Sequence, residues 1–207
     1  MQPSKRVSQP TSDLNHYYLG KPMITTCKTL NIVAVACTAV VLQIAPMTAH
    51  ALDSATIDYG SGNQTRMIRV GMQWKWEKKW WQSNGSHVGG YWDLGLAQWR
   101  ERRFQGMPSN THNLASIGMT PVFRLQSDSL TGPYGEVGIG IHYLSDLYNN
   151  NGRQLSTRFQ FGDRIGMGYV FHNQLDLGLM FEHFSNGGIK APNSGVNFGV
   201  VRVRYQF

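Results

Sequence analysis

Cysteine and charge are both scarce in this sequence of 207 residues. The two cysteines, Cys27 and Cys37, both precede residue 51. A chain shortened to residues 52–207 therefore has neither a disulfide bridge nor a thiolate nucleophile. Charged residues make up 15% of the sequence, below the roughly 25% that is usual in soluble domains. Glycine, with 23 residues, and the aromatic residues, at 12%, are abundant, which is an unusual composition for a soluble domain.

Long apolar runs are also lacking, apart from one near the amino terminus. Residues 30–44 are predominantly apolar, follow the basic residues Lys21 and Lys28, and precede a small-x-small cleavage pattern at residues 49–51. A membrane-spanning helix usually needs about 20 apolar residues, which disfavours an uncleaved membrane anchor. We therefore predict a cleaved signal peptide at residues 1–51 and one exported domain at residues 52–207.

The charge balance does not indicate nucleic acid as a partner. The formal net charge is +7, but several of the basic residues lie in the predicted signal peptide. The remaining chain is mildly basic and carries no motif of a nucleic-acid-binding module. His87, His112, His142 and His172 are scattered without the spacing of metal ligands, so we expect no metal site and no cofactor.

Helical periodicity is missing after residue 51, and a period of two takes its place. Apolar faces alternate with faces that carry charges of both signs; Ile68 and Val70, for example, flank Arg69. This alternation predicts eight strands, at about 52–61, 64–77, 88–99, 113–125, 133–143, 157–171, 174–185 and 196–207.

Two architectures are compatible with such faces. A soluble sandwich would expose the charged faces, whereas an outer-membrane barrel would turn the apolar faces to lipid and pack the charges inside. Long strands and a terminal strand ending in Phe207 favour the barrel. So do tryptophans near the strand ends, where interfacial girdles lie. These are Trp74, Trp76, Trp80, Trp81, Trp92 and Trp99. We predict an all-β fold: an eight-stranded antiparallel up-and-down transmembrane β-barrel in the bacterial outer membrane.

The last two predicted strands carry a candidate site. Alternation places His183 and Ser185 together on an otherwise apolar face, and Asn197 on the same face of the next strand. A serine becomes a nucleophile when a histidine takes its proton and a third group fixes the histidine tautomer. The register of the preceding tight turn brings Asp163 opposite His183 as a second candidate partner. Glu182 points to the other face, where it would pair with interior arginines.

A basic segment, Arg100–Arg103, follows the third predicted strand. If the amino terminus starts in the periplasm, this segment lies at the outer end of the barrel, level with the phosphates of lipopolysaccharide. Arg100, Arg102 and Arg103 are therefore candidate substrate-binding residues. A solvated charged loop is an equally good interpretation.

The segment His183-Phe184-Ser185-Asn186-Gly187-Gly188-Ile189, followed by Pro192-Asn193-x-Gly195 and a terminal strand ending in Phe207, resembles the signature of the PagL family of lipid A 3-O-deacylases. The segments GDRIGMGYVFHNQLDLGLMFEHFSN and GEVGIGIHYLS are also similar to that family. The resemblance is close over residues 157–207 and looser over the rest of the predicted mature chain.

The resemblance implies an outer-membrane barrel that hydrolyses the ester-linked 3-hydroxyacyl chain at position 3 of lipid A, in the outer leaflet. Lipopolysaccharide would be its substrate. Ser185 would be the nucleophile and His183 the general base. Asn186, the Gly188 amide and Asn193 would supply the oxyanion donors.

The sequence departs from the family at one position of this site. Asn197 stands where the family's familiar member has a glutamate. An amide oxygen can orient an imidazole, but it cannot stabilise an imidazolium by charge. Our hypothesis is that Asn197 orients His183 while Asp163 supplies the negative charge.

Two other functions fit parts of the sequence. A non-enzymatic barrel, structural or adhesive, would explain the alternation and Phe207 but gives no reason for a histidine, serine and asparagine on the lipid-facing side. An acyltransferase would add a chain to lipid A instead of removing one. The sequence leaves open whether the barrel forms a homodimer.

Overall fold

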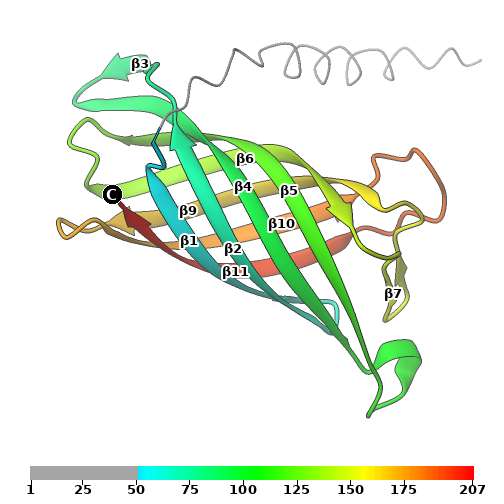
Figure 1. The fold of residues 1–207 in the computed structure, drawn as a ribbon. Helices are drawn as coiled ribbons and strands as arrows, with labels where there is room; N and C mark the ends of the chain where they lie inside the picture. The colour runs from blue at the N-terminus through cyan, green and yellow to red at the C-terminus, as the bar shows by residue number, and fades with distance from the viewer. Residues whose placement is uncertain (1–50) are drawn as a thin grey trace, which may run out of the picture. The chain divides into compact units, whose positions relative to one another are not determined.

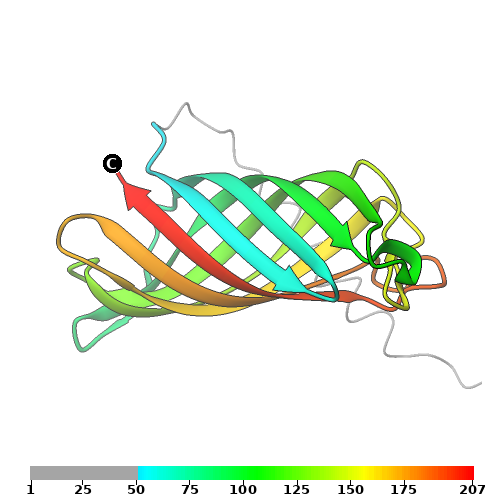
Figure 2. The ribbon, with the colours of Figure 1, turned by 90° about the horizontal axis from the view of Figure 1, so that it is seen from below.

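The computed structural model describes residues 51–207, and the predicted signal peptide lies outside the described residues except for Ala51. Eight long strands form one closed antiparallel barrel, which confirms the predicted fold (Figure 1). They are β1 (Ser54–Gly62), β2 (Thr65–Lys75), β4 (Ser86–Arg102), β5 (Thr111–Ser127), β6 (Gly132–Leu144), β9 (Phe159–Val170), β10 (Leu175–Ser185) and β11 (Val196–Gln206). The pairing of β1 with β11 closes the barrel (Figure 2).

Strands β4 and β5 are 17 residues each and extend beyond their predicted bounds. The shorter elements lie in segments that the alternation left as loops, because they are too short to show a period. They are β3 (Trp80–Ser83), the 3-10 helix η1 (Phe104–Gly106), β7 (Asn149–Asn150) and β8 (Arg153–Gln154). In the part of the chain that is described, no helix is long and apolar enough to cross a membrane.

The two ends of the barrel differ. We call the end with segments 103–110, 145–158 and 186–195 the loop end. At the opposite end, which we call the terminal end, β1 begins and β11 stops (Figure 1). Here the Phe207 amide donates to the Asp53 carbonyl at 2.9 Å.

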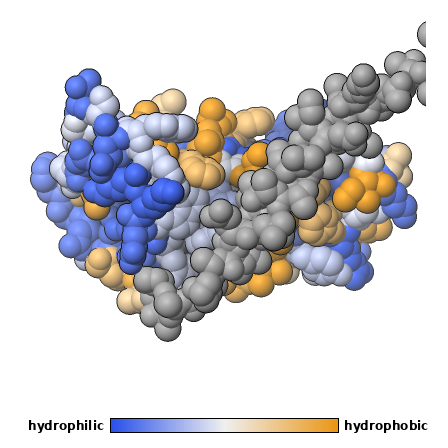
Figure 3. All heavy atoms as spheres, turned by 90° about the horizontal axis from the view of Figure 1, so that it is seen from above, coloured by the Kyte–Doolittle hydropathy of each residue, from blue (hydrophilic) through white to orange (hydrophobic). Residues whose placement is uncertain are grey.

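The outer surface is apolar, as the alternation predicts. Ile68, Leu179 and Ile165 have exposed fractions of 58%, 62% and 61%, although each lies in the middle of a regular strand. In Figure 3, hydrophilic residues gather at the left end of the barrel, and hydrophobic residues are visible along the wall to the right of it. Water would make such a surface costly, whereas lipid would not, so this arrangement is typical of a membrane barrel.

Charges fill much of the interior. Five buried arginines, Arg69, Arg124, Arg164, Arg202 and Arg204, form one network with five buried carboxylates, Asp58, Asp93, Glu136, Asp176 and Glu182, while a sixth buried carboxylate, Glu101, contacts His112 instead. Arg202, for example, bonds Asp58 at 2.8 Å and Asp93 at 3.1 Å. Within this network, equal numbers of opposite charges give each buried ion a partner, without which its burial would cost several kcal/mol.

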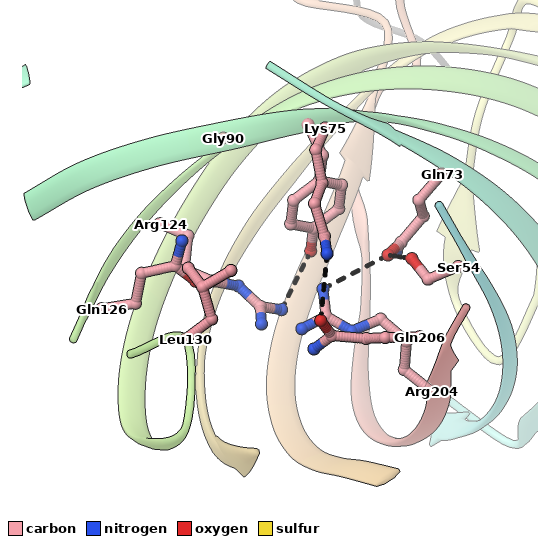
Figure 4. A pocket seen from close by; sticks show the side chains of 10 residues that line it. Ser54, Gln73, Lys75, Gly90, Arg124, Gln126, Leu130, Arg204 and Gln206 are labelled. Atoms are coloured by element: carbon pink, nitrogen blue, oxygen red, sulfur yellow. Dashed lines mark hydrogen bonds between the residues drawn. The ribbon is translucent and has the colours of Figure 1, made fainter. Parts of the chain in front are cut away.

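Neutral polar groups continue this network at the terminal end. Gln73 accepts hydrogen bonds from Ser54 at 2.9 Å and from Arg204 at 3.3 Å (Figure 4). The Lys75 ammonium donates to the Gln206 side chain at 3.1 Å. These contacts join the three neighbouring strands β2, β1 and β11 through their side chains at this end.

The interior is apolar near the loop end. The Trp99 ring packs against those of Phe184 and Phe198, with ring centroids 4.9 and 4.8 Å away. The expected place of Trp99 in an interfacial girdle is therefore wrong. Its parity along β4 turns it inward, where it is fully buried.

Tyr148 ties the segment 145–158 to this apolar interior. Its hydroxyl lies 2.8 Å from the Thr65 hydroxyl and accepts a hydrogen bond from the Asn63 side chain at 2.8 Å. Burial raises the pKa of the Tyr148 phenol, because desolvation disfavours the phenolate. The neutral phenol is thus held between the first hairpin and the loop.

Candidate active site

Strands β10 and β11 place the predicted site residues on the outer face near the loop end. His183 and Ser185 are partly exposed and Asn197 is exposed. The residues between and beside them, Phe184 and Phe198, point inward and are almost completely buried. The tightly packed interior therefore fixes the backbone from which the site residues project.

His183 and Asn197 are direct partners across β10 and β11. The Nδ1 atom of His183 lies 2.6 Å from the side-chain oxygen of Asn197. Because an amide oxygen can only accept, Nδ1 carries the hydrogen. The other ring nitrogen, Nε2, is then unprotonated in the neutral ring and can accept a proton.

Asp163 is the cross-strand partner of His183 on the other side, as the turn register predicts. It is exposed, and within residues 51–207 no ion pair or hydrogen bond joins it to His183. Glu182 points inward as predicted and binds Arg69 with contacts of 3.0 and 2.7 Å. Asn197 is thus the predicted partner that contacts the imidazole.

Ser185 lies two residues beyond His183 on the same face of β10. Its hydroxyl oxygen is 3.5 Å from the backbone nitrogen of Gly187, which donates to it. An amide beside the predicted nucleophile is a local hydrogen-bond donor, of the kind that stabilises negative charge in an ester hydrolase.

Gly195 also lies at the site. It belongs to the motif Pro192-Asn193-x-Gly195, but the sequence did not indicate a role for it. Its backbone has φ +66, and a β-carbon built there would lie 2.4 Å from Cε1 of His183. The backbone thus covers one side of the imidazole at a distance that only glycine permits. Periodicity could not reveal this, because the contact depends on how the loop folds back.

The segment 186–195 fixes the three predicted oxyanion residues. The Asn186 side chain is buried, donates to the Lys190 carbonyl at 2.7 Å and accepts from the Gly188 amide at 3.0 Å. The Asn193 side-chain oxygen accepts from the Asn186 amide at 3.1 Å. The Asn186 side-chain oxygen and the Gly188 amide are therefore bonded to each other inside the loop. Asn193 uses only its side-chain oxygen in this way, so its NH₂ group remains a donor.

A second loop supports this segment, and sequence reasoning missed it. The Ser156 hydroxyl oxygen lies 2.7 Å from the carbonyl oxygens of both Lys190 and Pro192, and its single hydrogen can be donated to either of them. Leu155 forms a β-bridge with Asn193. Segment 145–158 thus holds segment 186–195, which we call the oxyanion loop after its predicted role, in place. Tertiary contacts produce this support, and no local sequence pattern indicates it.

The predicted substrate-binding arginines are not beside this site. Arg100 and Arg102 end β4, and Arg103 follows it in a left-handed conformation with φ 52. Around the ring of eight strands, β4 is four positions from β10 in either direction. The structure therefore brings His183, Ser185 and Asn197 together, with Asp163 and the oxyanion loop beside them, but separates all of these from the arginines.

Most of the chain is similar to known proteins. Residues 66–206 match the sequence model of the family described as lipid A 3-O-deacylase (PagL). A lipid A deacylase PagL of Pseudomonas aeruginosa is 32% identical over 148 residues, covering 72% of this chain and 82% of the relative. One of Bordetella bronchiseptica is 30% identical over 179 residues, covering 81% and 93%. A crystal structure of the outer membrane enzyme PagL superposes with a TM-score of 0.64 at 29% identity, covering 74% of this chain and 99% of that one.

Proposed function

Because the chain belongs to the lipid A 3-O-deacylase (PagL) family of outer-membrane ester hydrolases, we propose that it removes the 3-hydroxyacyl chain at position 3 of lipid A by a serine-histidine mechanism. We further propose that the reaction takes place in the outer leaflet. The site lies at the end of the barrel opposite to Asp53 and Phe207, which supports this orientation.

In the proposed mechanism Ser185 attacks the ester carbonyl while Nε2 of His183 takes its proton. The tetrahedral intermediate then collapses, the bond to the sugar oxygen breaks, and His183 returns the proton to that oxygen. Water, activated by the same imidazole, hydrolyses the acyl-serine and frees the 3-hydroxy fatty acid. The reaction needs no further reactant.

One observation carries the proposal: Asn197 holds Nδ1 of His183 at 2.6 Å while Ser185 projects from the same face of the same strand. This leaves Nε2 as the base. On a surface that faces lipid, such a polar group is costly unless it lies at the interface or has a function.

The remaining groups take supporting roles in this proposal. Asp163, opposite His183 without contacting it, adds negative charge that favours the imidazolium. The NH₂ group of Asn193 stabilises the oxyanion, and the Gly187 amide lies next to the nucleophile. Asn186 and Gly188 contribute by ordering the loop that carries Asn193, since their polar groups are already bonded to the loop.

Mass spectrometry of lipid A from cells that express the chain tests the proposal. We expect wild type to produce lipid A that lacks one 3-hydroxyacyl group, and Ser185→Ala to leave lipid A unchanged. Ser61→Ala is the matched control, since Ser61 is an exposed serine on β1. A folded wild-type barrel that leaves lipid A intact would reject hydrolysis. Lipid A that gains a chain would indicate acyl transfer instead.

A further inference from the structure

Four arginines surround a hollow at the loop end, on the side of the barrel away from the candidate active site. The hollow is lined by Arg66, Arg100, Arg102, Arg103, Gln64 and Thr111, among others. We call these four arginines the arginine cluster. We propose that the arginine cluster binds the phosphate groups of a second lipopolysaccharide molecule, one that is not being hydrolysed.

The first argument is an arrangement that is unfavourable without a ligand. Arg66 and Arg100 are direct cross-strand partners on β2 and β4, and both are exposed on the outer face. Like charges directly opposite each other destabilise a sheet. Within residues 51–207, no carboxylate forms an ion pair with any member of the cluster. A bound anion would remove this repulsion.

The nearest acid is not available as a counter-charge. Glu101 lies between Arg100 and Arg102 in sequence, but it points inward, is fully buried and contacts Nδ1 of His112 at 2.8 Å. The Nε atom of Arg102 is also buried and has no hydrogen-bond partner. A donor left unmet in this way is costly. The hollow therefore offers positive charge that no carboxylate within residues 51–207 neutralises.

The backbone around the hollow is fixed. The Arg102 amide donates to the Gln64 carbonyl at 2.8 Å, and the Asn150 side chain donates to the Arg102 carbonyl at 3.2 Å. These bonds join the β1–β2 turn, the end of β4 and the segment 145–158. The arginines thus project from a preformed frame, not from a free loop.

The surface next to the cluster identifies the class of ligand. Ile68 and Val70 on β2 and Leu96 on β4 continue the same outer face toward the terminal end, with exposed fractions of 58%, 52% and 51%. An anionic group above a lipid-facing strip is the chemistry of a phospholipid-like molecule with its chains along the strip. In the outer leaflet, phosphorylated lipid A has this chemistry.

The position of the cluster separates it from the substrate. Since β4 lies opposite β10 in the ring, a lipid whose ester reaches Ser185 lies against the other side of the barrel. The cluster therefore holds a neighbouring lipid. This inference does not depend on hydrolysis, and it replaces the expected role of Arg100, Arg102 and Arg103 in binding the substrate.

Photocrosslinking tests this inference without requiring turnover. Lipid A with a diazirine on one acyl chain is added to the refolded full-length barrel in phosphatidylcholine vesicles, in the Ser185→Ala background so that lipid is not consumed. We expect labelled peptides from β2 and β4 as well as from β10. The double variant Arg66→Gln, Arg100→Gln should lower the apparent affinity measured from β2 and β4 labelling about thirtyfold. Labelling of β10 should not change.

Two controls make the result specific. Arg158→Gln removes an exposed arginine at the same end but outside the hollow, and should leave the β2 and β4 labelling intact. Dephosphorylated lipid A should label β2 and β4 as weakly as the double variant does. Equal labelling of these strands in wild type and the double variant, or equal labelling with dephosphorylated lipid A, would overturn the proposal. Loss of the β10 labelling in the double variant would show that the cluster binds the substrate instead.

Discussion

Replacing Asn197 by aspartate tests the central geometry of the site. The substitution keeps the shape of the side chain and the acceptor at 2.6 Å from Nδ1 of His183, but adds a negative charge. Two unit charges about 4 Å apart attract each other by about 1 kcal/mol in water and about 4 kcal/mol near a protein surface. His183 is partly exposed and Asn197 is exposed, so the attraction should lie toward the lower of these two values. We therefore expect the carboxylate to stabilise the imidazolium of the transition state by about 1.5 kcal/mol. That corresponds to a roughly tenfold rise in kcat.

The assay is the release of 3-hydroxy fatty acid from lipid A in detergent micelles, measured by mass spectrometry as a function of pH. The carboxylate favours the protonated ring, so the neutral base appears only at higher pH, and the acidic limb of the profile should move upward. Asn197→Leu is the control: it has a similar size but no acceptor, and should lower kcat at least about a hundredfold by releasing the tautomer. If wild type and both variants have the same kcat, the bond to Asn197 does not orient the base, and the reasoning fails.

Three further substitutions probe the support of the site. Gly195→Ala should lower kcat at least about tenfold with little change in KM, since its β-carbon would displace the His183 ring; unchanged kcat would refute the contact. Phe184→Ala should lower the free energy of unfolding, measured in urea and lipid vesicles, by about 3–5 kcal/mol, and a loss below 1 kcal/mol would contradict its place in the core. Glu182→Gln should cost about 3 kcal/mol in the same assay, because Arg69 loses a charged partner, whereas equal stability would mean that Arg69 does not need it.

The alternation in the sequence predicted most of the barrel because each strand repeats the same two-residue period over a long stretch. Leu177 and Leu179 face outward and Asp176 and Glu182 face inward, as their parity indicates. Trp99 shows the limit of this reasoning. Its place near a strand end suggested a girdle, but parity along β4 decides its direction and turns it into the core.

The candidate site was predictable where it depends on strand pairing and not where it depends on loops. The tight turn before β10 fixed the register, which placed Asp163 opposite His183, and the longer hairpin brought in Asn197. No such rule governs a ten-residue loop. The contact of Gly195 with the imidazole and the support of the oxyanion loop by Ser156 both depend on a folded path that no period encodes.

The same alternation couples the charged interior to the site. Along β10 the side chains alternate in direction. Glu182 points inward to Arg69, and Phe184 points inward to Trp99. His183 and Ser185 point outward. A slip of one residue would bury the imidazole and turn Glu182 toward lipid, leaving Arg69 without that carboxylate. The interior ion pairs therefore also stabilise the strand register. The register that leaves the fewest charges unpaired is the one that exposes His183 and Ser185. For this reason the interior, although it lies apart from the proposed active site, determines whether His183 and Ser185 share the outer face of β10.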